Sequence, residues 1–410
     1  MATVVLLGTL DTKGGEYAYL RSLLSGHGVE TVLVDAGVLG QPRVQPDVAR
    51  EEVAQAAGAD VTALADAGDR GAAVEAMARG AAEIVTRLHA EGRLDGALAL
   101  GGSGGTAIAA EAMRALPVGV PKLIVSTMAS GDTRPYVGAS DVTMTYSVVD
   151  IAGVNAVSSR ILANAAAAIA GMAQAEPPTV EGGKPLVGAT MFGVTTPCVT
   201  AARERLEELG YEVLVFHATG TGGQSMEALM RSGFITASLD ITTTELADDL
   251  VGGVLSAGPD RLEAAGELGL PQVVSLGALD MVNFGPMETV PAEFRDRLLY
   301  KHNPTVTLMR TTAEECAELG RRIGRKLSAA TGPVTLFIPL RGVSLIDVEG
   351  QVFYDPEADS ALFEAVRETL DPRVDVRELD TDVNDPAFAQ AMADTLHERY
   401  QAWAAGGVRT

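Results

Sequence analysis

The stretch Leu94–Met113, LDGALALGGSGGTAIAAEAM, decides how the rest of the sequence is interpreted. An apolar run, Ala97–Leu100, ends in the glycine-rich segment GGSGGT, Gly101–Thr106, and an alanine-rich helical pattern follows at once. This pattern predicts a strand, a tight loop and the start of a helix. Glycines allow close approach to the backbone, and the first amides of a helix attract anions. We therefore expect a phosphate site here, although a tight strand-to-helix turn also needs glycine for its shape alone.

Two familiar nucleotide motifs do not fit this loop. A Walker A loop would place a lysine after the glycines, where Ala107 and Ile108 stand instead. A dinucleotide fingerprint would have an acid after the next strand, but the apolar run Leu123–Ser126 offers none. NAD is therefore disfavoured, while a phosphate or another nucleotide remains open.

A second polar loop follows the first predicted strand. The apolar run Thr3–Leu7 leads into GTLDTKGG, Gly8–Gly15. In a doubly wound sheet of order 2-1-3, the first and third strands are neighbours, and ligands bind outside their carboxyl ends. If Ala97–Leu100 is the third strand, both polar loops face one crevice.

The side chains of this second loop suit a phosphate and its metal ion. Lys13 could neutralise the phosphate, Thr12 or Ser103 could donate to it, and Asp11 could hold Mg²⁺ through water. The alternative for Lys13 is a solvated position in the first helical turn. A third loop, Ser126–Asp132, could form another wall or be an ordinary surface loop. The predicted nucleotide-binding residues are Gly8, Asp11, Thr12, Lys13, Gly101, Gly102, Ser103, Gly104, Gly105, Thr106, Ser130, Gly131 and Asp132.

The alternation of short apolar runs with helical segments predicts an α/β fold of two doubly wound, Rossmann-like domains with mainly parallel sheets. Pro177-Pro178 and Gly182-Gly183 break the pattern just before a fresh apolar run. We therefore place a nucleotide-binding domain at 1–180 and a substrate or second domain at 181–410. Because polar loops follow the strands of both halves, we expect the two sheets to face a shared cleft.

The second half carries its own candidate site. The segment HATGTGG resembles a second anion cradle, and GALDMVNFGP and YKHNPTVTLMRTT crowd acids, amides and cations into a short stretch of an acidic chain. Structural histidines and salt bridges within the domain are the alternatives. The predicted substrate or second-site residues are Thr195, Thr196, His217, Thr219, Gly220, Thr221, Gly222, Asp280, Asn283, Lys301, His302 and Arg310.

Composition excludes several classes of function. A net charge of −23 and a pI near 4.6 disfavour nucleic acid and anionic membrane surfaces as partners. No apolar run reaches the ~20 residues of a membrane-spanning helix, and the N-terminus has no basic leader, so we expect a cytoplasmic protein. Cys198 and Cys316 have no spacing typical of zinc ligands, so we expect reduced thiols.

The polar loops together resemble a known family. LGTLDTKGGEY, LGGSGGT, STMASGDTRPYVG, GATMFGVTTPCV, HATGTGG, LGALDMVNFGP and HNPTVTLMRTT are similar to the uncharacterised two-domain family that includes the ATP-binding N-terminal region of the tomato mosaic virus resistance protein. The resemblance covers almost the whole chain. It implies two Rossmann-like subdomains, ATP binding in the first, and self-association. In longer relatives a TIM-barrel domain follows, so a separate TIM-barrel protein is a conceivable partner.

The sequence therefore predicts an ATP-binding protein that uses Mg²⁺. One hypothesis is an enzyme, of phosphotransfer or ligase type, that activates or phosphorylates a small carboxylate or sugar acid between the domains. The alternative is a nucleotide-responsive module that recognises a protein partner without turnover. A third hypothesis uses the glycine loops for a substrate phosphate, with no nucleotide. The small-residue helix expected over Asn155–Ala173 suits close packing, in this chain or against a second copy, and we expect a homodimer or larger oligomer.

Overall fold

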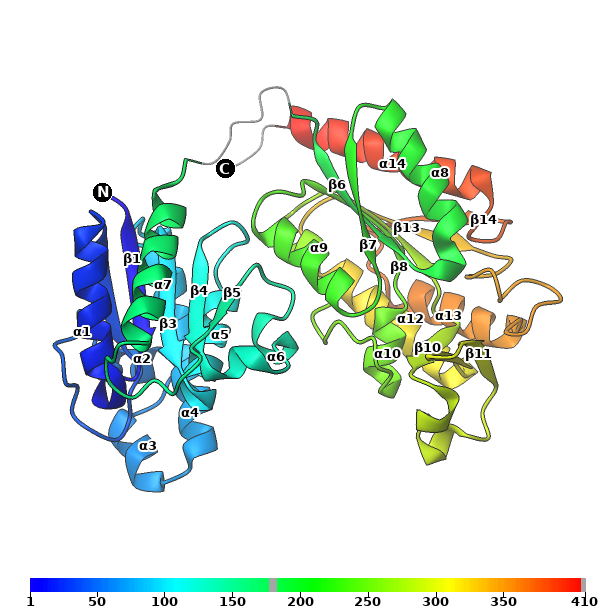
Figure 1. The fold of residues 1–410 in the computed structure, drawn as a ribbon. Coiled ribbons are helices and arrows are strands. Elements are labelled where there is room, and N and C mark those ends of the chain that lie inside the picture. The colour runs from blue at the N-terminus through cyan, green and yellow to red at the C-terminus, as the bar shows by residue number, and fades with distance from the viewer. Residues whose placement is uncertain (177–182, 407–410) are drawn as a thin grey trace. The chain divides into compact units, whose positions relative to one another are not determined.

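The computed structural model describes residues 1–176 and 183–406 (Figure 1). By its contacts the chain divides into two compact units, Met1–Thr179 and Val180–Thr410. The predicted boundary near residue 180 falls outside the described residues. Whether the two sheets face a shared cleft stays a prediction.

The N-terminal unit is a five-stranded parallel sheet with helices on both faces. Its strand order is β2-β1-β3-β4-β5, which confirms the predicted neighbouring of the first and third strands. The elements are β1 (Thr3–Gly8), α1 (Leu10–Gly26), β2 (Glu30–Asp35), α2 (Arg50–Ala56), α3 (Val61–Ala67), α4 (Arg70–Ala90), β3 (Gly96–Gly101), α5 (Ser103–Arg114), β4 (Lys122–Ser126), η1 (Thr127–Ser130), α6 (Arg134–Val137), β5 (Thr143–Tyr146) and α7 (Ser158–Gln174).

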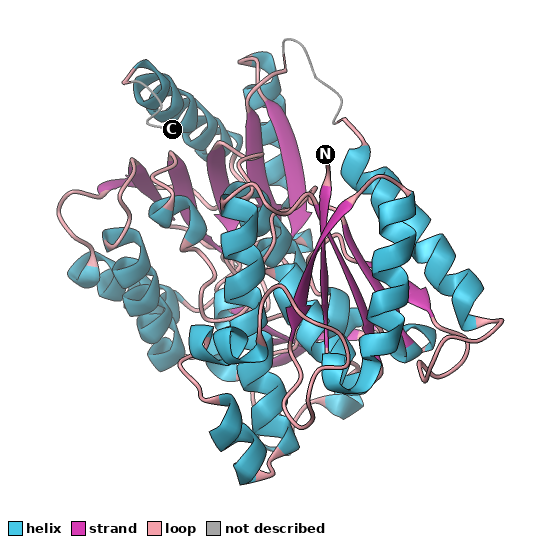
Figure 2. Ribbon diagram, turned by 90° about the vertical axis from the view of Figure 1, so that its left-hand side faces the viewer, coloured by secondary structure: helices cyan, strands magenta, loops and turns pink. Residues whose placement is uncertain are grey.

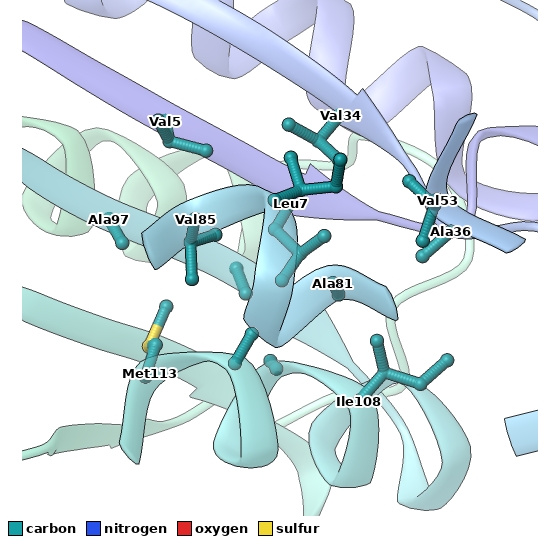
Figure 3. Packing of buried hydrophobic residues seen from close by; sticks show 14 of the residues in the cluster. Val5, Leu7, Val34, Ala36, Val53, Ala81, Val85, Ala97, Ile108 and Met113 are labelled. Atoms are coloured by element: carbon teal, nitrogen blue, oxygen red, sulfur yellow. The ribbon is translucent and has the colours of Figure 1, made fainter. Parts of the chain in front are cut away.

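The central strands of this sheet are apolar at every position because both of their faces are covered. Val5 and Leu7 of β1 pack with α4 and α5 on one face (Figure 3). Val4 and Leu6, the alternate residues, pack with α1 and α7 on the other face. Helix α7 therefore uses its apolar side within this unit, so its composition no longer requires a second copy of the chain.

The C-terminal unit contains a six-stranded parallel sheet of order β14-β13-β9-β8-β6-β7. Helices again cover both faces, as Figure 2 shows for both units. The elements are β6 (Leu186–Met191), η2 (Gly193–Thr195), α8 (Thr196–Glu208), β7 (Glu212–His217), α9 (Thr221–Arg231), β8 (Ala237–Thr242), α10 (Glu245–Val251), α11 (Ala264–Glu267), β9 (Gln272–Gly277), β10 (Met281–Phe284), η3 (Met287–Thr289), η4 (Ala292–Phe294), β11 (Leu299–Asn303), β12 (Val306–Arg310), α12 (Ala313–Ser328), β13 (Val334–Pro339), α13 (Pro356–Thr369), β14 (Asp375–Leu379) and α14 (Pro386–Ala405).

A small antiparallel sheet of order β10-β12-β11 is the main departure from the sequence prediction. The segments GALDMVNFGP and YKHNPTVTLMRTT were predicted as polar loops, and this prediction is wrong for most of their length. Successive apolar residues of β10 pack on opposite faces, as a strand requires: Val282 and Phe284 belong to one core cluster and Met281 to another. Met281 packs with Leu308, Val194 and Phe353. The fold class, two doubly wound and mainly parallel sheets, is confirmed.

Among the residues that the structure describes, no helix is both long enough and apolar enough to cross a membrane.

Tyr17 ties the two central strands of the N-terminal unit together. Its fully buried hydroxyl donates to the carbonyl of Leu7 in β1 and accepts from the amide of Leu100 in β3 at 2.8 Å. Gly8 makes room for the ring, because a Cβ there would lie 2.0 Å from the tyrosine oxygen.

We predict that Tyr17→Phe lowers the unfolding free energy of this unit by about 1–3 kcal/mol, since two buried backbone groups lose their partner. Urea unfolding followed by far-UV circular dichroism tests this, while fluorescence of Trp403, the single tryptophan, reports the other unit. Tyr19→Phe is the control, because the Tyr19 hydroxyl has no hydrogen-bond partner in the described part of the chain. Equal effects of the two substitutions would contradict the prediction.

Candidate functional site

A cavity of about 550 Å³ lies at the carboxyl ends of β1 and β3. The loop after β1 contributes Thr9 and Asp11–Lys13, and the glycine loop contributes Gly102–Gly105. Cavities of about 300–1,000 Å³ commonly hold small molecules, and a sheet of this type places them where the strand order reverses. The structure thus brings the two polar loops into one cavity, and that cavity lies wholly within the N-terminal unit.

The glycine loop divides into residues that build the turn and residues that face the cavity. A Cβ on Gly101 would lie 2.4 Å from the amide nitrogen of Thr106, so glycine is required there for the turn itself. The Thr106 hydroxyl is buried against that of Ser126 at 2.6 Å. A Cβ on Gly104 would meet only the Arg70 and Val74 side chains, both at 3.6 Å. Gly104 is therefore glycine without a packing requirement, as expected where a ligand approaches.

Lys13, the predicted phosphate cation, is engaged elsewhere in this structure. Its ammonium group lines the cavity but donates to the carbonyl oxygen of Ile151 at 2.5 Å. Arg70, at the start of α4, takes the position expected of the cation. Its guanidinium reaches the Gly104 face of the loop, is exposed, and has no hydrogen-bond or ion-pair partner among the described residues.

Asp11 fixes a loop with one of its carboxylate oxygens, and its predicted role at a metal ion stays a prediction. Its Oδ2 accepts from the amides of Leu39 and Gly40, both at 3.2 Å, and its Oδ1 is buried with no partner. Neighbouring Asp35 is also buried, which together with the charge of Asp11 raises the pKa of its carboxyl. No cluster of three or more acidic, histidine or cysteine ligands occurs in the described residues. The described residues therefore offer no preformed set of three such ligands, which leaves water-mediated binding of Mg²⁺ at Asp11 as a prediction.

The remaining predicted nucleotide residues lie outside the cavity lining. Gly8 packs on Tyr17, as described above. Asp132 pairs with exposed Arg134 at 2.8 Å, and neither it nor its neighbours Ser130 and Gly131 line the cavity. The third loop approaches the site only through Thr127, whose hydroxyl would be 3.8 Å from a Cβ on Gly102.

The predicted second anion cradle is already filled by the protein's own carboxylate. Oε1 of Glu245 accepts from the amides of Gly220 and Gly223 at 2.7 and 3.1 Å. Its Oε2 pairs with Nε of Arg261 at 2.7 Å, and both side chains are almost fully buried. Burial raises the pKa of Glu245, while Arg261 and the two amides oppose the rise. The glycine pattern correctly indicated an anion, but the prediction of an external ligand is wrong at these two amides.

Most of the other predicted second-site residues do not converge. The Thr195 hydroxyl bonds to that of Thr242 at 2.7 Å, and Thr196 donates to the carbonyl of Phe192. Asn283 is buried and donates to Asp248 at 2.6 Å. The residues left exposed or half-buried at element ends and on β11 are His217, Thr219, Thr221, Gly222, Lys301 and His302.

Asp280 and Arg310 belong to one buried cluster, which includes two acids missed by the sequence analysis, and they interact through their charges. The Arg310 guanidinium contacts Asp359 at 2.7 Å and Asp347 at 3.2 Å, while Asp280 accepts from Ser344 at 2.7 Å. Burial raises the pKa of Asp280 to about 6 and, with the charge of Asp280, that of Asp347 to about 9. Two of the three carboxyls contact the guanidinium, and burial together with their mutual repulsion raises the pKa of the acids in this cluster.

Comparison with known proteins places both units in one family. Residues 2–178 match the N-terminal domain, and residues 184–400 the C-terminal domain, of the uncharacterised protein family UPF0261. A UPF0261 protein of Clostridium tetani is 57% identical over 394 residues, which cover 96% of this chain and 98% of that protein. The ToMV resistance protein Tm-1(GCR237) of Solanum lycopersicum is 47% identical over 336 residues, 80% of this chain and 45% of that protein. Among solved structures, UDP-N-acetylglucosamine 2-epimerase from Rickettsia bellii aligns with 100% of this chain and 99% of its own at 11% identity, but a TM-score of 0.24 supports no inference.

We predict that Glu245→Ala lowers the unfolding free energy of the C-terminal unit by about 1–3 kcal/mol, because it leaves two buried amides and Nε of Arg261 without their acceptor. The charge of Arg261 stays paired with Asp240. Urea unfolding followed by Trp403 fluorescence measures this unit directly. Glu267→Ala removes a 55% exposed carboxylate that also pairs with an arginine, and should change little. A Glu245→Ala midpoint equal to that of the control would show that the internal carboxylate is dispensable.

Proposed function

Because the chain belongs to the UPF0261 family, as its loop motifs predicted, we propose from the geometry of its own site that it binds ATP in the cavity of the N-terminal unit. The proposed role is that of an enzyme which activates or phosphorylates a small carboxylate or sugar acid. One observation carries the proposal: among the described residues no carboxylate bonds to the amides of Gly102–Gly105, and the unpaired guanidinium of Arg70 lies beside them.

The phosphate side of the cavity combines three favourable features. Helix α5 begins at Ser103, so its first amides and its dipole favour negative charge at this point. Gly104 leaves space for a phosphate oxygen to approach the backbone. Arg70 adds a planar guanidinium, which suits bidentate contact with phosphate. Lys13 can add a second cation, because its ammonium group has three donors and the Ile151 carbonyl takes one of them.

The cavity also has an extended apolar lining, which suits a nucleoside base. It is lined by Leu39, Leu64, Val74, Met77 and Ile108, together with small alanines. A sugar phosphate would leave this apolar surface without a partner, so the wall favours a nucleotide over a small phosphorylated substrate. Asp11 keeps one carboxylate oxygen without a hydrogen-bond partner among the described residues, so water-mediated contact of Asp11 with the Mg²⁺ of Mg-ATP stays part of the proposal.

One feature favours the second candidate function, a nucleotide-responsive module without turnover. The two acids in the cavity lining are both engaged: Asp11 holds the amides after β2, and Asp69 caps α4 by accepting from Ala72 at 3.1 Å. Within the described lining, therefore, each carboxylate that could act as a base already holds a loop or caps a helix through one of its oxygens. Incubation with Mg-ATP and a panel of sugar acids separates the candidates, because steady ADP release requires the enzyme.

We predict that Gly104→Val abolishes ATP binding by filling the approach to the loop, and that Arg70→Ala weakens it roughly 10- to 100-fold, the value of one charge-assisted contact. Isothermal titration with Mg-ATP gives the affinities. Thermal melting without ligand checks the fold, and the shift with ligand follows from mass action. Lys13→Ala should have the smaller effect of the two cation substitutions.

Arg93→Ala is the matched control, since Arg93 is an exposed arginine of the same unit that precedes β3, at the opposite edge of the sheet. If Gly104→Val and Arg70→Ala bind ATP as tightly as Arg93→Ala does, the glycines are only a tight turn and the proposed site is wrong.

A further inference from the structure

The C-terminal unit contains a second cavity that the proposed ATP site does not use. It has a volume of about 450 Å³ and lies beyond the carboxyl end of β13. One wall is a single face of α13, formed by residues spaced at helical intervals: Pro356, Asp359, Ser360, Phe363 and Arg367. The other wall is the segment after β13, with Leu340, Arg341, Glu349 and Tyr354.

Two arginines line this cavity, and each forms an exposed ion pair in which a ligand carboxylate can replace the protein's own. Arg341 is bidentate to Asp380 at 2.6 and 2.7 Å, but the two side chains are 66% and 72% exposed. Arg367 contacts Glu378 at 2.6 Å, with both side chains more than one third exposed. Such exposed pairs contribute little to stability. An incoming carboxylate can therefore take over either guanidinium at small cost.

Asp359 connects the cavity to the buried acidic cluster. It is the cluster member that lines the cavity, and behind it Arg310 is held by Asp347 as well. Asp280 is fully buried and its Oδ1 has no hydrogen-bond partner in the described structure. The carboxylate oxygens of this cluster outnumber the donors around them. A ligand hydroxyl that donates to Asp359 from the cavity would therefore stabilise the cluster. Asp359, with the hydroxyls of Ser360 and Tyr354, thus forms a wall that can bond to hydroxyl groups.

We propose that this cavity binds a small carboxylate that carries hydroxyl groups, a molecule of the sugar-acid class. Arg341 and Arg367 bind its carboxylate, and Asp359, Ser360 and Tyr354 bind its hydroxyls. A monoanion suits the two arginines better than a phosphate dianion does, because the four carboxylates of Glu349, Asp359, Asp380 and Glu378 lie in or beside the cavity and repel the greater charge more strongly. This site would bind the acid substrate of the proposed function, on which the proposal rests. Its test needs no nucleotide, so the acid site and the ATP site can fail separately.

The test is calorimetric titration of the full-length chain, without nucleotide, using D-gluconate as the probe. Acetate, which lacks the hydroxyls, and sorbitol, which lacks the carboxylate, are the comparison ligands. The parent should bind gluconate more tightly than either. Arg341→Gln and Arg367→Gln should each weaken gluconate about tenfold, and together should abolish its binding. Arg203→Gln removes an exposed arginine of α8 outside the cavity and should leave the affinity unchanged.

Both arginines are surface residues, so thermal melting of each variant should match the parent. Asp359→Asn keeps the side-chain size and should alter gluconate affinity while leaving acetate affinity unchanged, which a purely structural role would not do. The proposal is overturned if gluconate binds no better than sorbitol or acetate. It is also overturned if the double arginine variant, folded like the parent, keeps the parent affinity.

Discussion

The parallel pairing of β1 with β3 is the contact on which the N-terminal site depends. Val4–Leu7 of β1 pair in register with Gly96–Ala99 of β3, so the loops that follow the two strands emerge at the same edge of the sheet. Tyr17 reinforces this register by bonding to both strands. A polar loop and a glycine loop about 90 residues apart in sequence thereby become two walls of one cavity.

The two glycine loops have the same local pattern but different surroundings. In the C-terminal unit, Glu245 reaches across from the start of α10 and satisfies the amides of Gly220 and Gly223, and Arg261 balances its charge. That loop is part of the core. Among the described residues, no carboxylate bonds to the amides of Gly102–Gly105 in the N-terminal unit, and Arg70 beside them has no hydrogen-bond or ion-pair partner. Both units have a glycine loop at the start of a helix. In the described structure, the C-terminal unit supplies its own carboxylate to the amides of that loop.

Features set by local sequence were predictable, and features set by distant contacts were not. Apolar runs that end in glycine identified β1, β3 and their loops, because strand burial and tight turns leave direct marks on composition. Arg70 gave no signal, since it meets the glycine loop only through the packing of α4 on α5. The same holds for Glu245 and for Asp347 and Asp359, whose partners lie far away in the chain. Lys13 was assigned to a phosphate from its position alone, and the carbonyl of Ile151 that it contacts could not be foreseen.

Amide hydrogen exchange in the presence and absence of Mg-ATP tests the central claim most directly, because it reports on the amides themselves. The account predicts that ATP slows exchange in the peptide spanning residues 101–108, where the amides of the glycine loop would bond to phosphate. Exchange in the peptide spanning 217–224 should stay unchanged, since Glu245 already holds the amides of Gly220 and Gly223 there. Protection of the second peptide alone, or of neither at saturating ATP, would contradict the assignment of the nucleotide to the N-terminal cavity.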